Sequence, residues 1–259
     1  MFGRRYVQRT PADVAGELRE LGRVIQPDHL WFADDIFGLT SCWLEAFARE
    51  VTARGAAIPF TMQSRVDLMS EPAVAALADA RCEEVWLGVE SASQPVLDAM
   101  DKGSTVTQVR EATRRLKRHG MRACWFIQLG YPGEEWDDIV RTRDLIREEG
   151  PDDIGVSVAY PLPGTTFYER VRAELRAKTN WSDSDDLAMM FHGTYSTDFY
   201  REIRTLLHEE VEARTSAGEV PAAWSFDARW SELARQAESR RSPSSVVFLP
   251  DVRRLARGG

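Results

Sequence analysis

Residues 85–91 read VWLGVES, an apolar run that passes Gly88 and ends in Glu90 and Ser91. The run has the length and the composition of a buried β-strand. A carboxylate is costly to remove from water unless it finds a partner, so its place at the end of such a strand needs an explanation. Either the strand reaches the surface at Glu90, or its end opens into a binding site.

The flanking sequence repeats this arrangement of a strand-like run followed by an amphipathic segment. The repeats span residues 1–178, at roughly 27 to 40 residues per unit, which is the spacing of βαβ units in a parallel sheet. Thr10, Thr40, Ser70 and Thr105 are expected to cap helices that alternate with the strands, the first of them ahead of the first strand. The expected strands lie at residues 29–35, 57–65, 84–90, 121–130 and 154–161.

Polar or conformationally special residues follow every expected strand at its carboxyl end. In α/β sheets and barrels, ligand sites are built at this end of the strands. One polar strand end is explained by a strand that surfaces, but five in succession favour a ligand site. The residues at the five strand ends are Asp34, Asp35, Gln63, Ser64, Arg65, Glu90, Ser91, Gln128, Gly130, Tyr131, Pro132, Gly133, Glu134, Tyr160 and Pro161.

The character of the sequence changes after Lys178. Residues 179–241 are expected to form a helical C-terminal extension, because they contain two amphipathic segments with helix-start signals. Residues 242–259 show little periodicity and end in a basic, glycine-rich stretch, which predicts a disordered tail. The domain organisation predicted from the sequence is therefore a β/α unit at 1–178, the extension and the tail.

Composition limits the classes of partner and location. The chain has 259 residues and a net charge of −8, with no long basic tract, so a nucleic-acid partner is not expected. No apolar run approaches the ~20 residues of a membrane span, and the first residues lack the apolar centre of a secretory signal. Cys42, Cys82 and Cys124 are odd in number and far apart, so free thiols are expected. The protein is predicted to be cytoplasmic.

The motifs, taken in order, resemble the barrel of the radical S-adenosylmethionine (SAM) superfamily. The resemblance is closest to the branch whose members carry a preceding cobalamin-binding domain, such as the anaerobic magnesium-protoporphyrin monomethyl ester cyclases and various methyltransferases. It implies a partial (β/α) barrel that binds SAM at the carboxyl ends of its strands. The matching segments are FADDIF (32–37), QSRVD (63–67), LGVESASQPVLDAMDKGST (87–105), FIQLGYPGE (126–134) and AYPLPGTTFYE (159–169).

The resemblance assigns roles to the first two strand ends. Asp34 and Asp35 stand where many members have a Gly-Gly-Glu stretch that contacts the methionyl ammonium of SAM. A carboxylate suits an ammonium group, but the departure from Gly-Gly puts the backbone part of that contact in doubt. Arg65 is placed to meet the SAM carboxylate, for which a guanidinium fork is suited.

The later strand ends receive roles in the same way. Glu90 and Ser91 resemble strand-end residues that hydrogen-bond the ribose or the methionyl group. Gln128, Gly130 and Tyr160 lie where the family packs the adenine, mostly through backbone and apolar contacts. Glu90 would then be buried with the cofactor as its polar partner.

The chain departs from the family most strongly at its start. Members carry a CxxxCxxC loop after the first strand, whose three thiolates hold a [4Fe–4S] cluster. Here no such motif is present, and the spacing of Cys42, Cys82 and Cys124 cannot replace it. The chain is therefore identified as an N-terminally truncated member, without the first strand, the cluster loop and any cobalamin domain. Its cofactor is expected to be SAM, and the cluster and cobalamin belong to the full-length form only.

Several functions remain open on this interpretation. The full-length enzyme is expected to perform radical methyl transfer or oxidative cyclisation on a small molecule that the sequence does not identify. The cluster-bearing segment is expected to precede this chain or to come from a partner chain. Alternatively, the chain is a non-catalytic SAM-binding or scaffold module that has lost its cluster site. A third hypothesis is an acid/base enzyme that uses Asp34, Asp35 and Glu90, although no His or Lys is expected to join these carboxylates.

Overall fold

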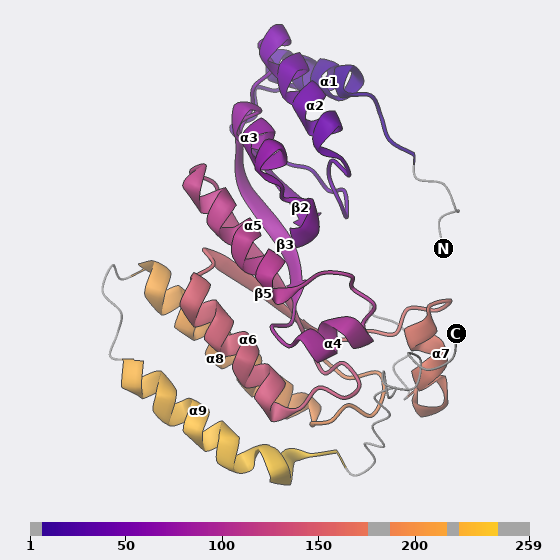
Figure 1. The fold of residues 1–259 in the computed structure, drawn as a ribbon, viewed down its shortest axis with the longest axis vertical. Coiled ribbons are helices and arrows are strands. Elements are labelled where there is room, and N and C mark those ends of the chain that lie inside the picture. Colours follow the sequence, from indigo (N-terminus) through magenta and orange to yellow (C-terminus); the bar gives the residue numbers. More distant parts are fainter. Residues whose placement is uncertain (1–6, 176–186, 217–222, 243–259) are drawn as a thin grey trace. The chain divides into compact units, whose positions relative to one another are not determined.

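The computed structural model of the chain describes residues 7–175, 187–216 and 223–242, and draws the rest as a thin grey trace (Figure 1). Five parallel strands form one sheet in the order β1-β2-β3-β4-β5, with helices between successive strands. The sheet is a half-barrel, and further helices follow it, as the sequence predicts. Within the described residues, no helix is long and apolar enough to cross a membrane.

The strands are β1 (Leu30–Trp31), β2 (Phe60–Arg65), β3 (Cys82–Glu90), β4 (Arg122–Leu129) and β5 (Asp153–Val158). The helices of the β/α part are α1 (Pro11–Val24), α2 (Ser41–Arg54), α3 (Glu71–Asp79), α4 (Gln94–Ala99), α5 (Val106–Arg118), α6 (Trp136–Glu149) and α7 (Thr166–Val171). The extension contributes α8 (Thr197–Ser216) and α9 (Ala223–Ala237). Residues 243–259, most of the predicted tail, lie outside the described residues.

The predicted helix starts are confirmed by side-chain caps. The hydroxyl of Thr10 accepts from the amide of Asp13, and Thr40 and Ser70 cap α2 and α3 in the same way. Thr105 and Gln108 form a reciprocal capping box at the start of α5. These caps satisfy amide groups that the first helical turn leaves without partners, which explains why they are readable from sequence.

Two elements are shorter than predicted. The strand expected at 29–35 is only two residues long, because the chain leaves the sheet after Phe32, whose amide still bonds the Thr61 oxygen at 3.0 Å. It returns at Phe37, whose amide bonds the Gln63 oxygen at 3.0 Å, so the acidic pair Asp34–Asp35 sits in an exposed loop. The sequence predicts a helix from Thr165 to Lys178, but α7 ends at Val171 and a short 3-10 turn follows, while residues 176–178 lie outside the described residues.

The chain divides into two compact units. The first comprises Met1–Val89, Ser104–Phe126 and Pro151–Ile154, and the second comprises Glu90–Gly103, Ile127–Gly150 and Gly155–Gly259. The core of the first unit includes an aromatic cluster in which the rings of Phe32 and Phe37 lie 4.3 Å apart.

In the second unit, α6, α8 and α9 lie side by side (Figure 1). The buried carboxylate of Glu210 on α8 ties them together: it accepts from Arg147 of α6 at 2.5 Å and from the indole of Trp230 of α9 at 2.9 Å.

Candidate functional site

A cavity of about 650 Å³ lies in the second unit. Its walls come from the carboxyl ends of β3 and β4, from the segment that follows β5, and from α4 and α7. Three of the residues predicted from sequence meet in this cavity, namely Glu90, Gln128 and Tyr160. The cavity therefore stands at the strand ends, where a site in an α/β fold is expected.

Glu90 is paired with a cation that the sequence analysis missed. The Nζ of Lys102 donates to Oε1 of Glu90 at 2.5 Å, and the two side chains are 23% and 17% exposed. The expectation that no Lys joins the strand-end carboxylates is therefore wrong. Lys102 follows α4 in the chain, and only the turn after that helix brings it back to the strand end.

The backbone of Glu90 is also unusual. Its φ of +64° lies in the left-handed region, which costs a residue with a side chain roughly 1–2 kcal/mol. Strain of this kind is found where the surrounding structure fixes a side chain in a functional position. Here it turns the Glu90 carboxylate toward Lys102 within the cavity lining.

An aromatic wall completes the cavity. The ring of Tyr131 packs against that of Phe167 on α7, with centroids 4.9 Å apart, and the Tyr131 hydroxyl donates to the Ala99 oxygen at 2.8 Å. Burial raises the pKa of Tyr131, so its hydroxyl stays neutral near pH 7. The cavity thus combines a flat apolar surface with an ion pair, which suits a ligand that carries both a planar ring and charged groups.

Two further residues expected at the site have different surroundings. The hydroxyl of Ser91 is fully buried, accepts from the amide of Ser93 at 3.1 Å and lies 3.4 Å from the hydroxyl of Thr142. It therefore organises the turn that leads into α4. Gly130 ends β4 with a φ of +77°, and its amide donates to Oε2 of Glu134 at 2.6 Å.

Glu134 is a buried acid that the sequence places after the fourth strand but to which it assigns only a helix-start role. It is 1% exposed, and burial raises the pKa of its carboxyl to about 8. The Gly130 amide opposes this rise and the negative charge of Asp138 adds to it. Glu134 is therefore mostly protonated at neutral pH. Its position just before the N-terminus of α6 is typical of a residue that starts a helix, and nothing in the neighbouring sequence indicates that its carboxyl is buried.

The remaining predicted residues belong to the first unit. The guanidinium of Arg65 forms two hydrogen bonds to Asp67, at 2.8 and 3.0 Å. Asp34 and Asp35 lie in the exposed loop after β1. These three residues and the cavity residues Glu90, Gln128 and Tyr160 are thus divided between the two units.

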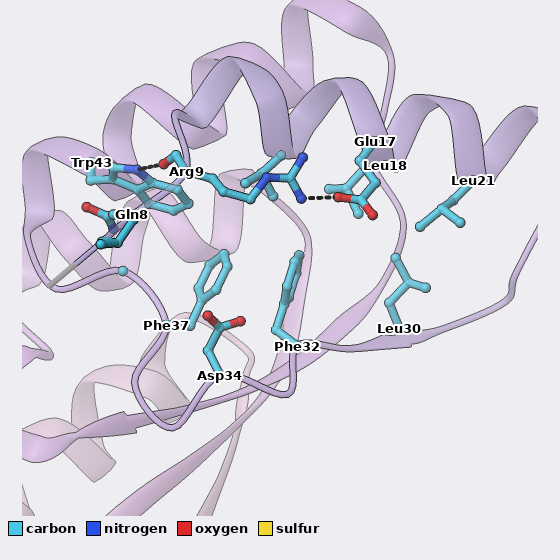
Figure 2. Close-up of a pocket in the computed structure, with 13 residues that line it drawn as sticks. Gln8, Arg9, Glu17, Leu18, Leu21, Leu30, Phe32, Asp34, Phe37 and Trp43 are labelled. Atoms are coloured by element: carbon cyan, nitrogen blue, oxygen red, sulfur yellow. Dashed lines mark hydrogen bonds and ion pairs between the residues drawn. The ribbon is translucent and has the colours of Figure 1, made fainter. Parts of the chain in front are cut away.

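Asp34 lines a second cavity of about 340 Å³, which lies between α1 and the β1 segment (Figure 2). Leu18 and Leu21 of α1 point into it from one side, and Phe32 and Phe37 point toward the helix from the other. We call this cavity the α1 groove. Its lining is mainly apolar and also includes Gln8, Asp34 and the ion pair of Arg9 with Glu17.

β1 lies at one edge of the sheet, and no other strand of the described residues pairs with its outer side. The amides of Leu30 and Phe32 donate to the backbone oxygens of Pro59 and Thr61, at 2.9 and 3.0 Å. In a parallel strand the intervening residue presents its backbone to the other side, so the peptide groups of Trp31 face outward. The side chain of Trp31 is large and the residue is 56% exposed. This edge can accept a further strand.

The described cysteines do not form a cluster site. Cys42 is exposed, whereas Cys82 and Cys124 are buried, and burial raises the pKa of both buried thiols. In the part of the chain that the structure describes, no three His, Cys, Asp or Glu side chains come together as metal ligands. These residues therefore do not fit a [4Fe–4S] cluster.

Comparisons with known proteins agree with the geometry. An uncharacterized methyltransferase of Pyrococcus horikoshii is 28% identical over 181 residues, which cover 70% of this chain and 39% of that protein. The bacteriochlorophyllide d C-12(1)-methyltransferase of Chlorobaculum tepidum is 27% identical over 128 residues, which cover 49% of this chain and 28% of that enzyme. The chain thus spans less than half of these relatives.

Solved structures share the fold. The radical SAM methyltransferase TsrM from Kitasatospora setae, with cobalamin and a [4Fe–4S] cluster bound, superposes with a TM-score of 0.55 at 21% identity, over 62% of this chain and 30% of that chain. The cobalamin-dependent radical SAM enzyme OxsB superposes with a TM-score of 0.50 at 16% identity, over 62% of this chain and 25% of the OxsB chain. The sequence pattern of the Radical SAM superfamily matches residues 1–146, more than half of the 259 residues. The chain belongs to the radical SAM superfamily.

Proposed function

We propose that this chain is the SAM-binding half-barrel of a radical SAM enzyme. The observation that carries the proposal is the cavity at the strand ends, in which Glu90 and Lys102 form an ion pair beside Gln128 and Tyr160. SAM carries a ribose, a carboxylate and a planar adenine. The cavity offers an acceptor, a cation and an aromatic wall for these three groups.

The chain's own residues would bind and orient the cofactor. The Glu90 carboxylate would accept hydrogen bonds from the ribose hydroxyls, and the Lys102 ammonium would meet the methionyl carboxylate. Gln128, Gly130 and Tyr160 would lie along the adenine. Ser91 would act through the turn that it holds, because its hydroxyl is already engaged.

Three residues of the first unit keep the roles that the family resemblance implies. Asp34 and Asp35 are proposed for the SAM ammonium and Arg65 for the SAM carboxylate, as the family resemblance implies. Arg65 would keep its hydrogen bonds to Asp67, which fix the plane of the guanidinium. In this proposal residues 1–178 form the cofactor-binding part and residues 179–241 the extension.

The full-length protein is proposed to carry a [4Fe–4S] cluster that supplies the electron for reductive cleavage of SAM. Radical methyl transfer on a small molecule is favoured, because two of the relatives are named methyltransferases. Oxidative cyclisation is the second candidate, and cobalamin is a further candidate cofactor of the full-length form. A cytoplasmic location is part of the proposal, since the three cysteines are free thiols.

The cluster-bearing segment is proposed to dock on the open edge of β1. The outward peptide groups of Trp31 would pair with a parallel strand, and the apolar α1 groove would receive alternate side chains of that strand. The segment would belong either to the same polypeptide or to a partner chain. The rival hypothesis is a non-catalytic SAM-binding module that needs no such strand.

One experiment separates these hypotheses. The coding DNA upstream of Met1 is read in frame for CxxxCxxC, and the extended protein is reconstituted with iron and sulfide without oxygen. With SAM and a reductant, the enzyme hypothesis predicts 5′-deoxyadenosine from the extended protein and none from the chain alone. An extended protein that binds neither iron nor SAM contradicts the enzyme hypothesis. A stop codon directly upstream, with no cluster-bearing partner gene, favours the module.

A further inference from the structure

A buried polar cluster lies around the carboxyl end of β4. Oε2 of Glu134 accepts from the Gly130 amide at 2.6 Å, and the Tyr200 ring of α8 covers Gly130. A Cβ on Gly130 would lie 3.1 Å from Cζ of Tyr200 and 3.0 Å from Cε of Met189. α8 therefore packs directly onto the strand end that carries Gln128 into the cavity.

The cluster is closed to water and contains no compensating charge. Glu134 and Tyr200 are 1% and 0% exposed, and the Tyr200 hydroxyl has no hydrogen-bond partner among the described residues. A buried carboxyl without a cation stays protonated. Burial raises the pKa of Tyr200 well above its ordinary value as well, with the Glu134 charge adding to this rise.

The charged groups around the cluster do not neutralise Glu134. On α6, Asp138 raises the pKa of Glu134, and Glu135 is engaged by Arg241 in an ion pair. Next to α8, Tyr195 is itself buried beneath Arg241, whose guanidinium lies 5.8 Å from the ring centroid. The Gly130 amide is the one group that favours the ionised form among those whose effect on Glu134 is resolved.

We propose that Glu134 and Tyr200 are a positioning pair: the neutral Glu134 carboxyl holds the Gly130 amide, and the Tyr200 ring keeps water away from that carboxyl. Through this pair, α8 of the C-terminal extension fixes the end of β4. The pair itself follows from the contacts within the second unit. Its link to SAM rests on the proposed function, in which the end of β4 lies along the adenine.

Ionisation of Glu134 has a defined consequence in this arrangement. A charged carboxylate cannot remain in a dry, uncompensated site, so water must enter between Tyr200 and Gly130. The end of β4 then loses its fixed geometry. The affinity of the cavity for its ligand should fall as pH rises through the titration of Glu134, although Glu134 itself does not touch the ligand.

The Gly130 amide reports this titration directly. The chain, which contains 17 glycines, is labelled with ¹⁵N-glycine, and the Gly130 amide shift is followed from pH 5 to pH 9.5. The expected midpoint is about 8 in the wild type. Glu134→Gln should abolish the transition and Glu212→Gln, an exposed change on α8, should leave it intact.

Variants at Tyr200 separate the ring from the hydroxyl. Tyr200→Phe should leave the midpoint within about 0.5 unit, because the hydroxyl has no partner to lose. Tyr200→Ala should lower the midpoint by at least about one unit toward the ordinary value, since water then reaches Glu134. If Tyr200→Ala does not fold, Tyr200→Leu, which leaves a smaller void, is measured in its place with the same expectation.

Two results would overturn the proposal. One is a wild-type midpoint between about 4 and 5, the range of an ordinary glutamate. The other is a midpoint that stays fixed when the Tyr200 ring is removed from a folded chain. A separate titration with S-adenosylhomocysteine at pH 6 and pH 9 tests the link to the cofactor. The wild type should bind more weakly at pH 9 than at pH 6, and Glu134→Gln should bind equally at both. Absence of binding at both pH values refutes SAM binding. The amide titration then still tests whether Glu134 and Tyr200 act as a positioning pair.

Discussion

Nζ of Lys102 lies 2.5 Å from Oε1 of Glu90, and the Glu90 backbone adopts a left-handed φ of +64° at the end of β3 where this contact is made. Glycine adopts that conformation without strain. A residue retained here at a cost in stability is expected to serve the cavity rather than the fold.

The Glu90→Gly variant tests this expectation. The gain from relieved strain and the loss of the ion pair are of similar size, so the free energy of unfolding should change by less than about 1 kcal/mol. SAM affinity should fall at least about tenfold. Gln26→Gly is the matched control, because Gln26 is exposed and has a φ of +52°. It should stabilise the chain by about 0.5–1 kcal/mol and leave affinity unchanged. Urea unfolding and calorimetry measure both quantities.

The pH dependence of stability follows from Glu134. Its pKa is about 8 in the folded chain, above the ordinary value of 4.5, so its stabilising contribution is complete below about pH 4.5. That contribution is lost as pH rises to about 8, with a slope of up to about 1.4 kcal/mol per pH unit. The wild type should lose unfolding free energy relative to Glu134→Gln over this interval, because the glutamine side chain does not ionise. A difference that stays constant from pH 5 to pH 9 would show that Glu134 is ionised in the folded chain.

Replacement by glutamine should lower the free energy of unfolding at one of two neighbouring glutamates on α8 and leave it nearly unchanged at the other. The Glu210 side chain is 7% exposed and binds Arg147, Arg214 and Trp230. Glu210→Gln should cost about 2 kcal/mol of unfolding free energy, because it leaves buried donors without their charged acceptor. Glu209 pairs with Arg229 at the surface and is 44% exposed, so Glu209→Gln should stay within about 0.5 kcal/mol. Equal losses in urea denaturation would contradict the assignment.

A pair of glycines isolates the packing of α8 on the end of β4. Gly130 and Gly120 both have a φ of +77°, but a Cβ on Gly120 meets nothing within 4 Å. Gly120→Ala should therefore cost only the backbone strain, about 1 kcal/mol. Gly130→Ala adds close contacts with Met189 and Tyr200 and should cost at least about 1 kcal/mol more. Thermal unfolding of the two variants under one condition provides the comparison.

Local signals explain what the sequence predicted correctly. The caps at Thr10, Thr40 and Thr105 act within one helical turn, and the apolar run at 85–89 fills one strand, so both are readable from neighbouring residues. The half-barrel follows from the alternation of such elements. Glu90, Gln128 and Tyr160 line one cavity because parallel strands end on the same side of a sheet, a relationship that the order of the strands makes readable.

The parts that were missed depend on contacts between distant segments. Lys102 reaches Glu90 only through the path of α4. Glu134 binds the amide of Gly130, and the ring that covers Gly130 belongs to Tyr200, 66 positions beyond Glu134. β1 ends after Trp31 because the chain leaves the sheet beyond Phe32 and returns at Phe37, a path that the apolar run at 30–33 does not reveal.

The most direct test of the central claim is calorimetric titration of SAM into the purified chain. The account predicts a dissociation constant below about 1 mM for the wild type and for Lys117→Met, an exposed change on α5. Lys102→Met should weaken binding at least about tenfold, or about 1.4 kcal/mol, because the cavity then lacks the cation beside Glu90. No binding by the folded wild type, or equal binding by Lys102→Met, would contradict a SAM site in this cavity.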